Sequence, residues 1–258
     1  IRENYRFDGI LIHKPGRDPD FGGLITAIDR DAEVPRIDLE DGWWIDCCRD
    51  DDPYLRPPSG FSLPADVLEV DPEDYLAWAP PPFRHWCLHK GTAVLRSEAD
   101  VPPYWYGCID EVLKAAGEEY SVHGEVRSPL DHFLNIMGIE NGMMGITMEP
   151  DHCQALLDSM TDSTIVWAVA QLRRGCEAIK LSSPYAGAGF LSRAMYADFV
   201  LPFERRIAEA VRGEGGVIYT HTCGAIGDRL DLMAESGING IETLDPPPLG
   251  TVELRGAK

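Results

Sequence analysis

The fold is most clearly indicated by residues 216–223, GVIYTHTC. This segment is short, apolar and rich in β-branched residues, which is typical of a buried strand. A helical pattern precedes it from Ser192 to Val211, ending at Gly213, and a second one follows from Asp228 to Ser236. Alternating strands and helices of this kind predict βα units around a parallel sheet.

The same alternation continues on both sides of that segment. Strands are predicted at residues 175–183 and 237–244, and upstream at 7–13 and 122–126, the last leading into a helix near 129–134. Residues 31–106 break the pattern, because they hold most of the prolines and two aromatic clusters. We expect an irregular elaboration with short antiparallel strands there, since its aromatic side chains need burial. The prediction is one α/β domain over residues 1–258.

Composition limits the class of protein. The chain has 258 residues, 44% hydrophobic and 26% charged, which favours a globular fold with a large core. A formal net charge of -20 argues against nucleic acid or an anionic membrane as a partner. The absence of a long apolar run and of a signal-peptide pattern predicts a cytoplasmic protein without a membrane span. The chain begins at Ile1 and stops at Lys258 just after a predicted strand and a proline loop, so we expect a fragment.

The cysteines and histidines suggest a metal site. Seven irregularly spaced cysteines favour free thiols or metal ligands over a disulfide framework. On a strand, His221 and Cys223 share one face about 6 to 7 Å apart, and imidazole and thiolate are ligands that zinc favours. The alternative is a buried cysteine and a hydrogen-bonded histidine beside a glycine turn. A second candidate set, His85, Cys87 and His89, lies in a proline-rich stretch where a hairpin is the favoured interpretation.

Several short blocks occur in the order seen in one known superfamily. They are Glu125–Asp131, Met148–Asp151, Ala186–Gly187 with Leu191–Ser192, Phe199–Phe203 and His221–Gly224. On these blocks the chain resembles the uroporphyrinogen decarboxylase superfamily over about residues 120–258. The resemblance implies an α/β fold of the (β/α)8 TIM-barrel type, incomplete at both ends of this chain.

The resemblance also separates two branches of that superfamily. A His-x-Cys pair ligates zinc together with a distant second cysteine in the cobalamin-dependent methyltransferases, such as the methylcobalamin:coenzyme M enzymes, whereas the decarboxylases lack the pair. The chain is similar to the methyltransferase branch. This implies Zn²⁺ at His221 and Cys223, with a third ligand some tens of residues beyond Lys258. It also implies a corrinoid (methylcobalamin) co-substrate on a separate corrinoid protein, and a thiol or related small molecule as methyl acceptor or donor.

Three further site residues follow from the same resemblance. The resemblance implies an acidic residue on the strand after the pair. Counted along this chain, its position is occupied by Leu244, which is not acidic. Glu242 has the same strand parity and is the predicted catalytic residue, whereas the neighbouring acidic residue, Asp245, begins the proline loop. Ser183 stands where many relatives carry an acidic residue, and Tyr185 follows it in the loop after a strand. Ser183 and Tyr185 are predicted to contact the substrate.

Two other functions remain open. Decarboxylation of a uroporphyrinogen-type tetrapyrrole would require an arginine-rich amino-terminal segment, which these residues lack, and a net charge of -20 is poorly suited to a polycarboxylate. The third hypothesis is a non-catalytic barrel that binds a corrinoid or tetrapyrrole. A protein that retains zinc and also turns over its substrate would be distinguished as the methyltransferase from both the decarboxylase and the non-catalytic barrel.

Overall fold

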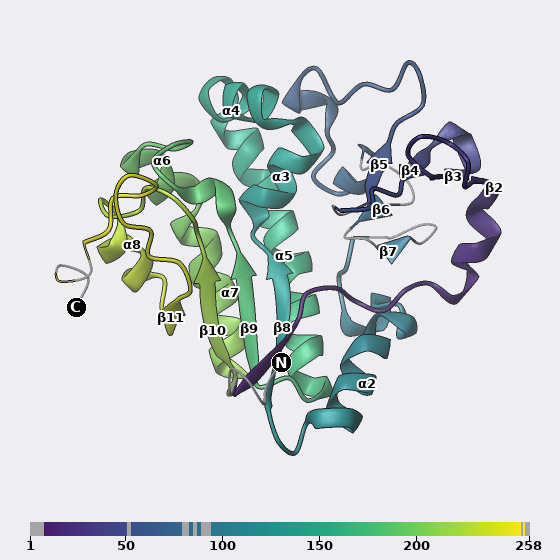
Figure 1. The fold of residues 1–258 in the computed structure, drawn as a ribbon. Coiled ribbons are helices and arrows are strands. Elements are labelled where there is room, and N and C mark those ends of the chain that lie inside the picture. The colour runs from purple at the N-terminus through teal and green to yellow at the C-terminus, as the bar shows by residue number, and fades with distance from the viewer. Residues whose placement is uncertain are drawn as a thin grey trace.

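A five-stranded parallel sheet forms the centre of the computed structural model, which describes residues 8–50, 53–78, 83–84, 87–88, 94–253 and 255 (Figure 1). The strand order is β1-β8-β9-β10-β11. The strands are Gly9–Ile12 (β1), Ser121–Arg127 (β8), Ala178–Ser182 (β9), Val217–His221 (β10) and Gly240–Ile241 (β11). Spatial order follows chain order, and all four pairings are parallel, as in the sheet of a βα barrel. The predicted α/β fold with a parallel sheet is confirmed.

Helices connect the strands of this sheet, and some of them cover one of its faces. They are Gly107–Ala116 (α2), Pro129–Met137 (α3), Ile139–Met148 (α4), Pro150–Arg174 (α5), Arg193–Phe199 (α6), Leu201–Gly213 (α7) and Leu230–Glu235 (α8). Helices α5 and α7 lie along the back of the sheet in Figure 1. Val122, Ile179, Leu181 and Ile218 point into this layer and are almost completely buried. Alternate residues of the same strands therefore point to the opposite face.

Several boundaries differ from the predictions. The helix expected from Ser192 to Val211 is divided into α6 and α7, because Pro202 at the start of α7 has no N–H to continue α6. The strand expected at 237–244 shortens to β11, so Glu242 lies just after a strand. Strand β10 ends at His221, which places Cys223 in the following turn.

A separate antiparallel sheet lies between β1 and β8 in sequence. Its strands, in spatial order, are Ile25–Asp29 (β2), Arg36–Leu39 (β3), Trp44–Asp46 (β4) and Tyr54–Arg56 (β5). This sheet has its own core around Phe21, Leu39 and Trp43. A two-stranded hairpin follows, Phe83–Arg84 (β6) with Cys87–Leu88 (β7). In Figure 1 these strands stand beside the parallel sheet, on the side of β1 and β8.

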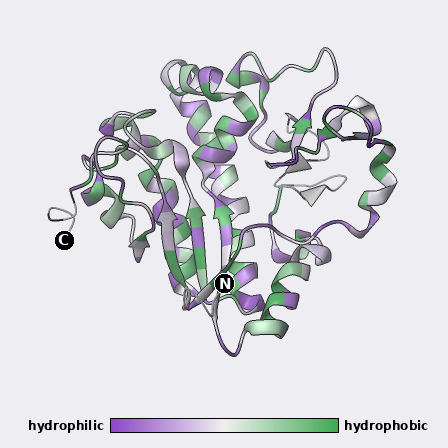
Figure 2. Cartoon of the chain, in the orientation of Figure 1, coloured by the Kyte–Doolittle hydropathy of each residue, from purple (hydrophilic) through white to green (hydrophobic). Residues whose placement is uncertain are grey.

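Hydrophilic and hydrophobic residues alternate along the central strands, as Figure 2 shows. One set packs against the helices, and the other set forms the polar face described below. In the part of the chain that the structure describes, no helix has the length and apolar character needed to cross a membrane.

Candidate functional site

Ionisable side chains line the face of the parallel sheet that points away from the helices, here called the inner face. They include Glu125 on β8, Lys180 on β9, and Tyr219 and His221 on β10. Glu125, Lys180 and Tyr219 are direct neighbours in the strand register. The corresponding positions of a βα barrel usually hold bulky branched apolar residues. The polar character of the inner face therefore indicates a binding or catalytic surface.

His221 and Cys223 come together at the carboxyl end of β10. Cys223 Sγ lies 3.5 Å from His221 Nε2, although Cys223 is outside the strand. His221 Nδ1, on the other side of the ring, lies 3.5 Å from Glu242 Oε2, but this contact lacks hydrogen-bond geometry, and Nδ1 is buried without a hydrogen-bond partner among the described residues. The same Glu242 oxygen lies 3.2 Å from Lys180 Nζ. The structure thus brings together all three residues predicted for metal binding and catalysis, and it adds Lys180.

The His221–Cys223 pair fits a zinc ion by donor chemistry and by spacing. In a tetrahedral site with zinc–nitrogen and zinc–sulfur bonds of about 2.0 and 2.3 Å, the nitrogen and sulfur are about 3.5 Å apart. The Nε2 to Sγ separation has this value. Within the described residues, however, no three His, Cys, Asp or Glu side chains converge as a metal site. The pair supplies two ligands, and Glu242 lies on the Nδ1 side of His221, away from Cys223 Sγ.

The turn that holds Cys223 is fixed from two sides. Gly224 has a φ of +81°, which a side chain would disfavour. Its N–H donates to Asp245 Oδ2 at 2.7 Å. From the other side, the N–H of Ala188 donates to the carbonyl oxygen of Ala225 at 2.7 Å. Asp245 begins the proline loop and acts here as a turn-holding acceptor.

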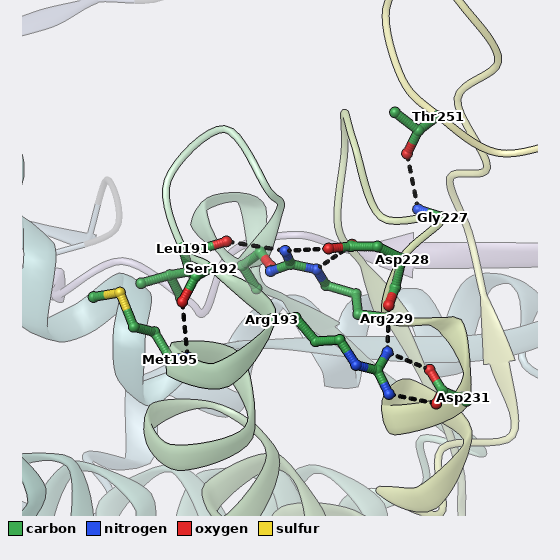
Figure 3. Close-up of polar contacts among 10 residues, drawn as sticks. Leu191, Ser192, Arg193, Met195, Gly227, Asp228, Arg229, Asp231 and Thr251 are labelled. Atoms are coloured by element: carbon green, nitrogen blue, oxygen red, sulfur yellow. Dashed lines mark hydrogen bonds and ion pairs between the residues drawn. The ribbon is translucent and has the colours of Figure 1, made fainter.

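Arg229 ties the loop after β9 to the loop after β10 (Figure 3). Its side chain is fully buried. The guanidinium donates to the carbonyl oxygens of Ala186 at 2.8 Å and Leu191 at 2.9 Å, and its Nε donates to Asp228 Oδ1 at 2.9 Å. It also lies over the ring of Tyr196, 5.4 Å from the centroid. The two loops that flank the candidate site are therefore held as one unit.

A second polar cluster lies deeper on the inner face. His123 Nδ1 and Tyr219 Oη are 3.1 Å apart, and His123 Nε2 is 3.0 Å from Ser121 Oγ. Burial lowers the pKa of His123 and raises the pKa of Tyr219 to about 12. Glu125 is almost buried and pairs with His13, which follows β1. These groups extend the polar surface from the His221–Cys223 pair toward the amino ends of the strands.

The two predicted substrate contacts occupy different environments. Tyr185 is half-buried in a turn after β9 and makes an edge contact with Phe190, at 5.1 Å between ring centroids. Ser183 is completely buried beside Glu204, and neither Ser183 Oγ nor Glu204 Oε1 has a hydrogen-bond partner with proper geometry among the described residues. Tyr196 donates to Glu204 Oε2 at 3.3 Å. Contact of Ser183 with a substrate stays a prediction and would require this layer to open.

The remaining cysteine and histidine candidates fall into an untested set and a buried set. His85 and His89 and the side chain of Cys87 lie outside the described residues, so that set stays untested. Cys153 and Cys176 are buried, and burial raises the pKa of each thiol to about 12. Such thiols are structural, because they stay protonated at neutral pH.

The sequence analysis missed Lys180, Arg229 and the turn-holding role of Asp245. Lys180 had a signal in the sequence, since a lysine stands inside the apolar segment AIKLS. An ionised side chain in a buried strand requires a partner, and such a partner is often functional. Asp245 and Arg229 had no local signal, because their partners are distant in the sequence.

Fold and site together define a class: a βα protein of the barrel type, with a candidate ligand pair at the carboxyl end of a strand. A family model described as uroporphyrinogen decarboxylase (URO-D) matches residues 79–247, which is more than half of the chain. The chain belongs to the URO-D family.

Relatives with two different activities are similar to this chain. A methylated-thiol–coenzyme M methyltransferase from Methanosarcina mazei is 27% identical over 137 residues, 53% of this chain and 36% of that protein. A methylcobamide:CoM methyltransferase from Methanosarcina acetivorans is 27% identical over 142 residues, 52% and 41% of the two chains. A uroporphyrinogen decarboxylase from Syntrophotalea carbinolica is 35% identical over 188 residues, 72% and 48% of the two chains. The chain thus matches between 36% and 48% of the length of these relatives.

A solved structure confirms the fold. A methyltransferase from Methanosarcina mazei superposes with a TM-score of 0.57 at 15% sequence identity, over 94% of this chain and 59% of that one. At this identity the likeness shows the fold alone. Family members are enzymes, methyltransferases or decarboxylases, and the family does not by itself decide between the two reactions.

Proposed function

We propose that this chain forms part of a zinc-dependent methyltransferase, which moves a methyl group between a corrinoid and a thiol or related small molecule. The observation that supports this most strongly is the 3.5 Å approach of Cys223 Sγ to His221 Nε2 at the carboxyl end of β10. The match to two methyltransferases whose names include coenzyme M agrees with it.

His221 Nε2 and Cys223 Sγ would hold the metal ion, with a further ligand from outside this chain. When bound, zinc would lower the pKa of an acceptor thiol that coordinates it, so that the sulfur of this thiol is nucleophilic at neutral pH. Glu242 lies 3.5 Å from His221 Nδ1, on the opposite side of the ring from Nε2, so that Nε2 faces Cys223 Sγ and would be the ligand atom. The Asp245 contact to Gly224 keeps the Cys223 turn in place.

In the proposed transfer, an acceptor thiol would take the methyl group on its sulfur and release its proton. The corrinoid would supply the methyl group and keep the electron pair of its cobalt–carbon bond. Transfer from a methylated small molecule to the corrinoid uses the same site, and the direction is open. A corrinoid protein is the proposed partner, since its cofactor must reach the carboxyl ends of the strands. A cytoplasmic location is part of the same proposal.

The test is metal content of the full-length protein, purified without chelators. We expect about one zinc per chain, lost in H221A and in C223A, because each variant removes one ligand. C108A is the matched control, since Cys108 is also exposed but lies on α2. Wild-type protein without zinc, or variants that retain it, would contradict the proposal.

Uroporphyrinogen decarboxylation is the second candidate. The decarboxylase from Syntrophotalea carbinolica has the higher identity over the longer match among the relatives described above. Turnover of uroporphyrinogen by metal-free protein, unaffected in C223A, would establish this reaction. Zinc-dependent methylation of a thiol with methylcobalamin would instead establish the methyltransferase reaction.

A further inference from the structure

Lys180 occupies an unusual position for a lysine. It lies in the middle of β9, with Glu125 of β8 and Tyr219 of β10 as register neighbours. Only 11% of its side chain is exposed. Burying an ammonium group is costly unless it is paired, so an apolar residue would be more stable here if packing alone decided. The residue therefore requires an explanation beyond packing.

The partner of Lys180 is Glu242, at 3.2 Å between Nζ and Oε2. Glu242 follows the two-residue strand β11, and its side chain is 40% exposed. In the described part of the chain its ion-pair partners are Lys180 and His221, and both contact Oε2. An exposed glutamate after a short strand has several rotamers available, so the contact with the nearly buried ammonium restricts its position.

The position of the Glu242 carboxylate determines which atoms face a metal ion. Carboxylates are themselves zinc ligands, so a mobile Glu242 would compete with, or add to, the His221–Cys223 pair. Held by Lys180, it lies beside His221 Nδ1, and Nε2 is left facing Cys223 Sγ. A carboxylate that accepts a hydrogen bond from the other nitrogen of a histidine ligand fixes the ring. Here Nδ1 is buried without a hydrogen-bond partner and lies 3.5 Å from this carboxylate, so a small movement of Glu242 toward it would complete that bond.

We propose that Lys180 is a positioning residue of the metal site, which holds Glu242 on the Nδ1 side of His221 and so keeps Nε2 and Cys223 Sγ as the metal-facing pair. The inference rests on the proposed function, because it assumes that this pair binds zinc. It goes further because it gives the Lys180–Glu242 ion pair, which joins β9 to the residue after β11, a role in metal binding.

The test is the zinc dissociation constant of the full-length protein, measured by competition with a chromophoric chelator. K180M replaces the ammonium by an apolar group of similar length, and E242Q removes the carboxylate charge while keeping its shape. Loss of a group that orients a metal-bound histidine weakens binding by about 10- to 100-fold, and we expect this from each variant. Because Lys180 acts through Glu242, K180M/E242Q should bind zinc no more weakly than E242Q alone. K180R keeps the positive charge beside Glu242, so its zinc dissociation constant should stay close to the wild-type value.

K114M is the matched control. It removes the charge of another lysine by the same substitution, but Lys114 is exposed on α2, outside the inner face. We expect it to bind zinc as the wild type does. The visible spectrum of the Co²⁺-substituted protein gives a second readout, since it should change in K180M and E242Q alike and not in K114M.

Each result separates this inference from the proposed function. If the wild type binds no zinc, the proposed function fails, and this inference fails with it. If the wild type binds zinc and K180M binds it equally well, only the role of Lys180 is refuted. Effects of K180M and E242Q that multiply in the double variant would also refute it. If K180M does not fold, E242Q and K180R decide, because the proposal requires the first to weaken binding and the second to preserve it.

Discussion

Arg229 offers the sharpest test of how the loops around the site are held. In R229M the carbonyl oxygens of Ala186 and Leu191 stay buried but lose their donors. A buried acceptor left without a donor costs about 1–3 kcal/mol, so the two together cost about 2–6 kcal/mol. The methionine recovers part of the packing over Tyr196, and Asp228 is half exposed and can be hydrated. We therefore expect R229M to lower the free energy of unfolding by about 3–5 kcal/mol.

Equilibrium urea unfolding of the full-length protein at neutral pH measures this effect. The matched control is R193M, because Arg193 lies in the same cluster and pairs with Asp231, but its side chain is 44% exposed (Figure 3). Exposed ion pairs contribute little, so the urea midpoint of R193M should stay close to that of the wild type. An R229M protein within about 1 kcal/mol of the wild type would refute the reasoning, since the buried carbonyl oxygens would then have found other donors.

Three further predictions concern single residues. Burial raises the pKa of Glu204 to about 7 from an ordinary 4.5, so the folded state keeps a proton that the unfolded state releases. The free energy of unfolding should therefore fall as the pH rises from about 4.5 to 7. At pH 8, E204Q should have a free energy of unfolding about 3 kcal/mol higher than that of the wild type, and at pH 4 the two should be equal. Urea unfolding that gives the same pH dependence for both proteins would contradict this. In G250A the new Cβ would lie 2.3 Å from the Asp245 carbonyl oxygen, so we expect a lower melting temperature, whereas G189A, which meets nothing within 4 Å, should melt like the wild type. The Cys153 thiol, with its pKa raised to about 12 by burial, should resist iodoacetamide at pH 8 in the native protein, and mass spectrometry that finds it rapidly alkylated would disprove its burial.

Local patterns in the sequence were sufficient for the type of fold. The apolar runs that contain Ile179 and Ile218 have their branched side chains on the helix-covered face, and the intervening helical patterns predict parallel pairing. The pattern alone did not give the boundaries, because they depend on single residues. Pro202 divides one predicted helix, and the strand before Glu242 ends after two residues.

The candidate ligand pair was also predictable, since His221 and Cys223 are close in sequence. Strand alternation placed them on one face, and they do approach each other, although Cys223 lies in a turn. Their distance from each other depends on the Gly224 conformation and its contact with Asp245, which the alternation rule does not describe.

The sequence by itself therefore determined the succession of strands and helices and the placement of a histidine and a cysteine at one strand end. Both depend on interactions within a few residues, which periodicity reveals. Only the tertiary structure decided that Glu242 is held by Lys180 beside His221, that Arg229 joins two loops, and that Ser183 is buried against Glu204. These contacts join residues tens of positions apart, and their energies depend on burial, which exists only after the strands and helices have packed.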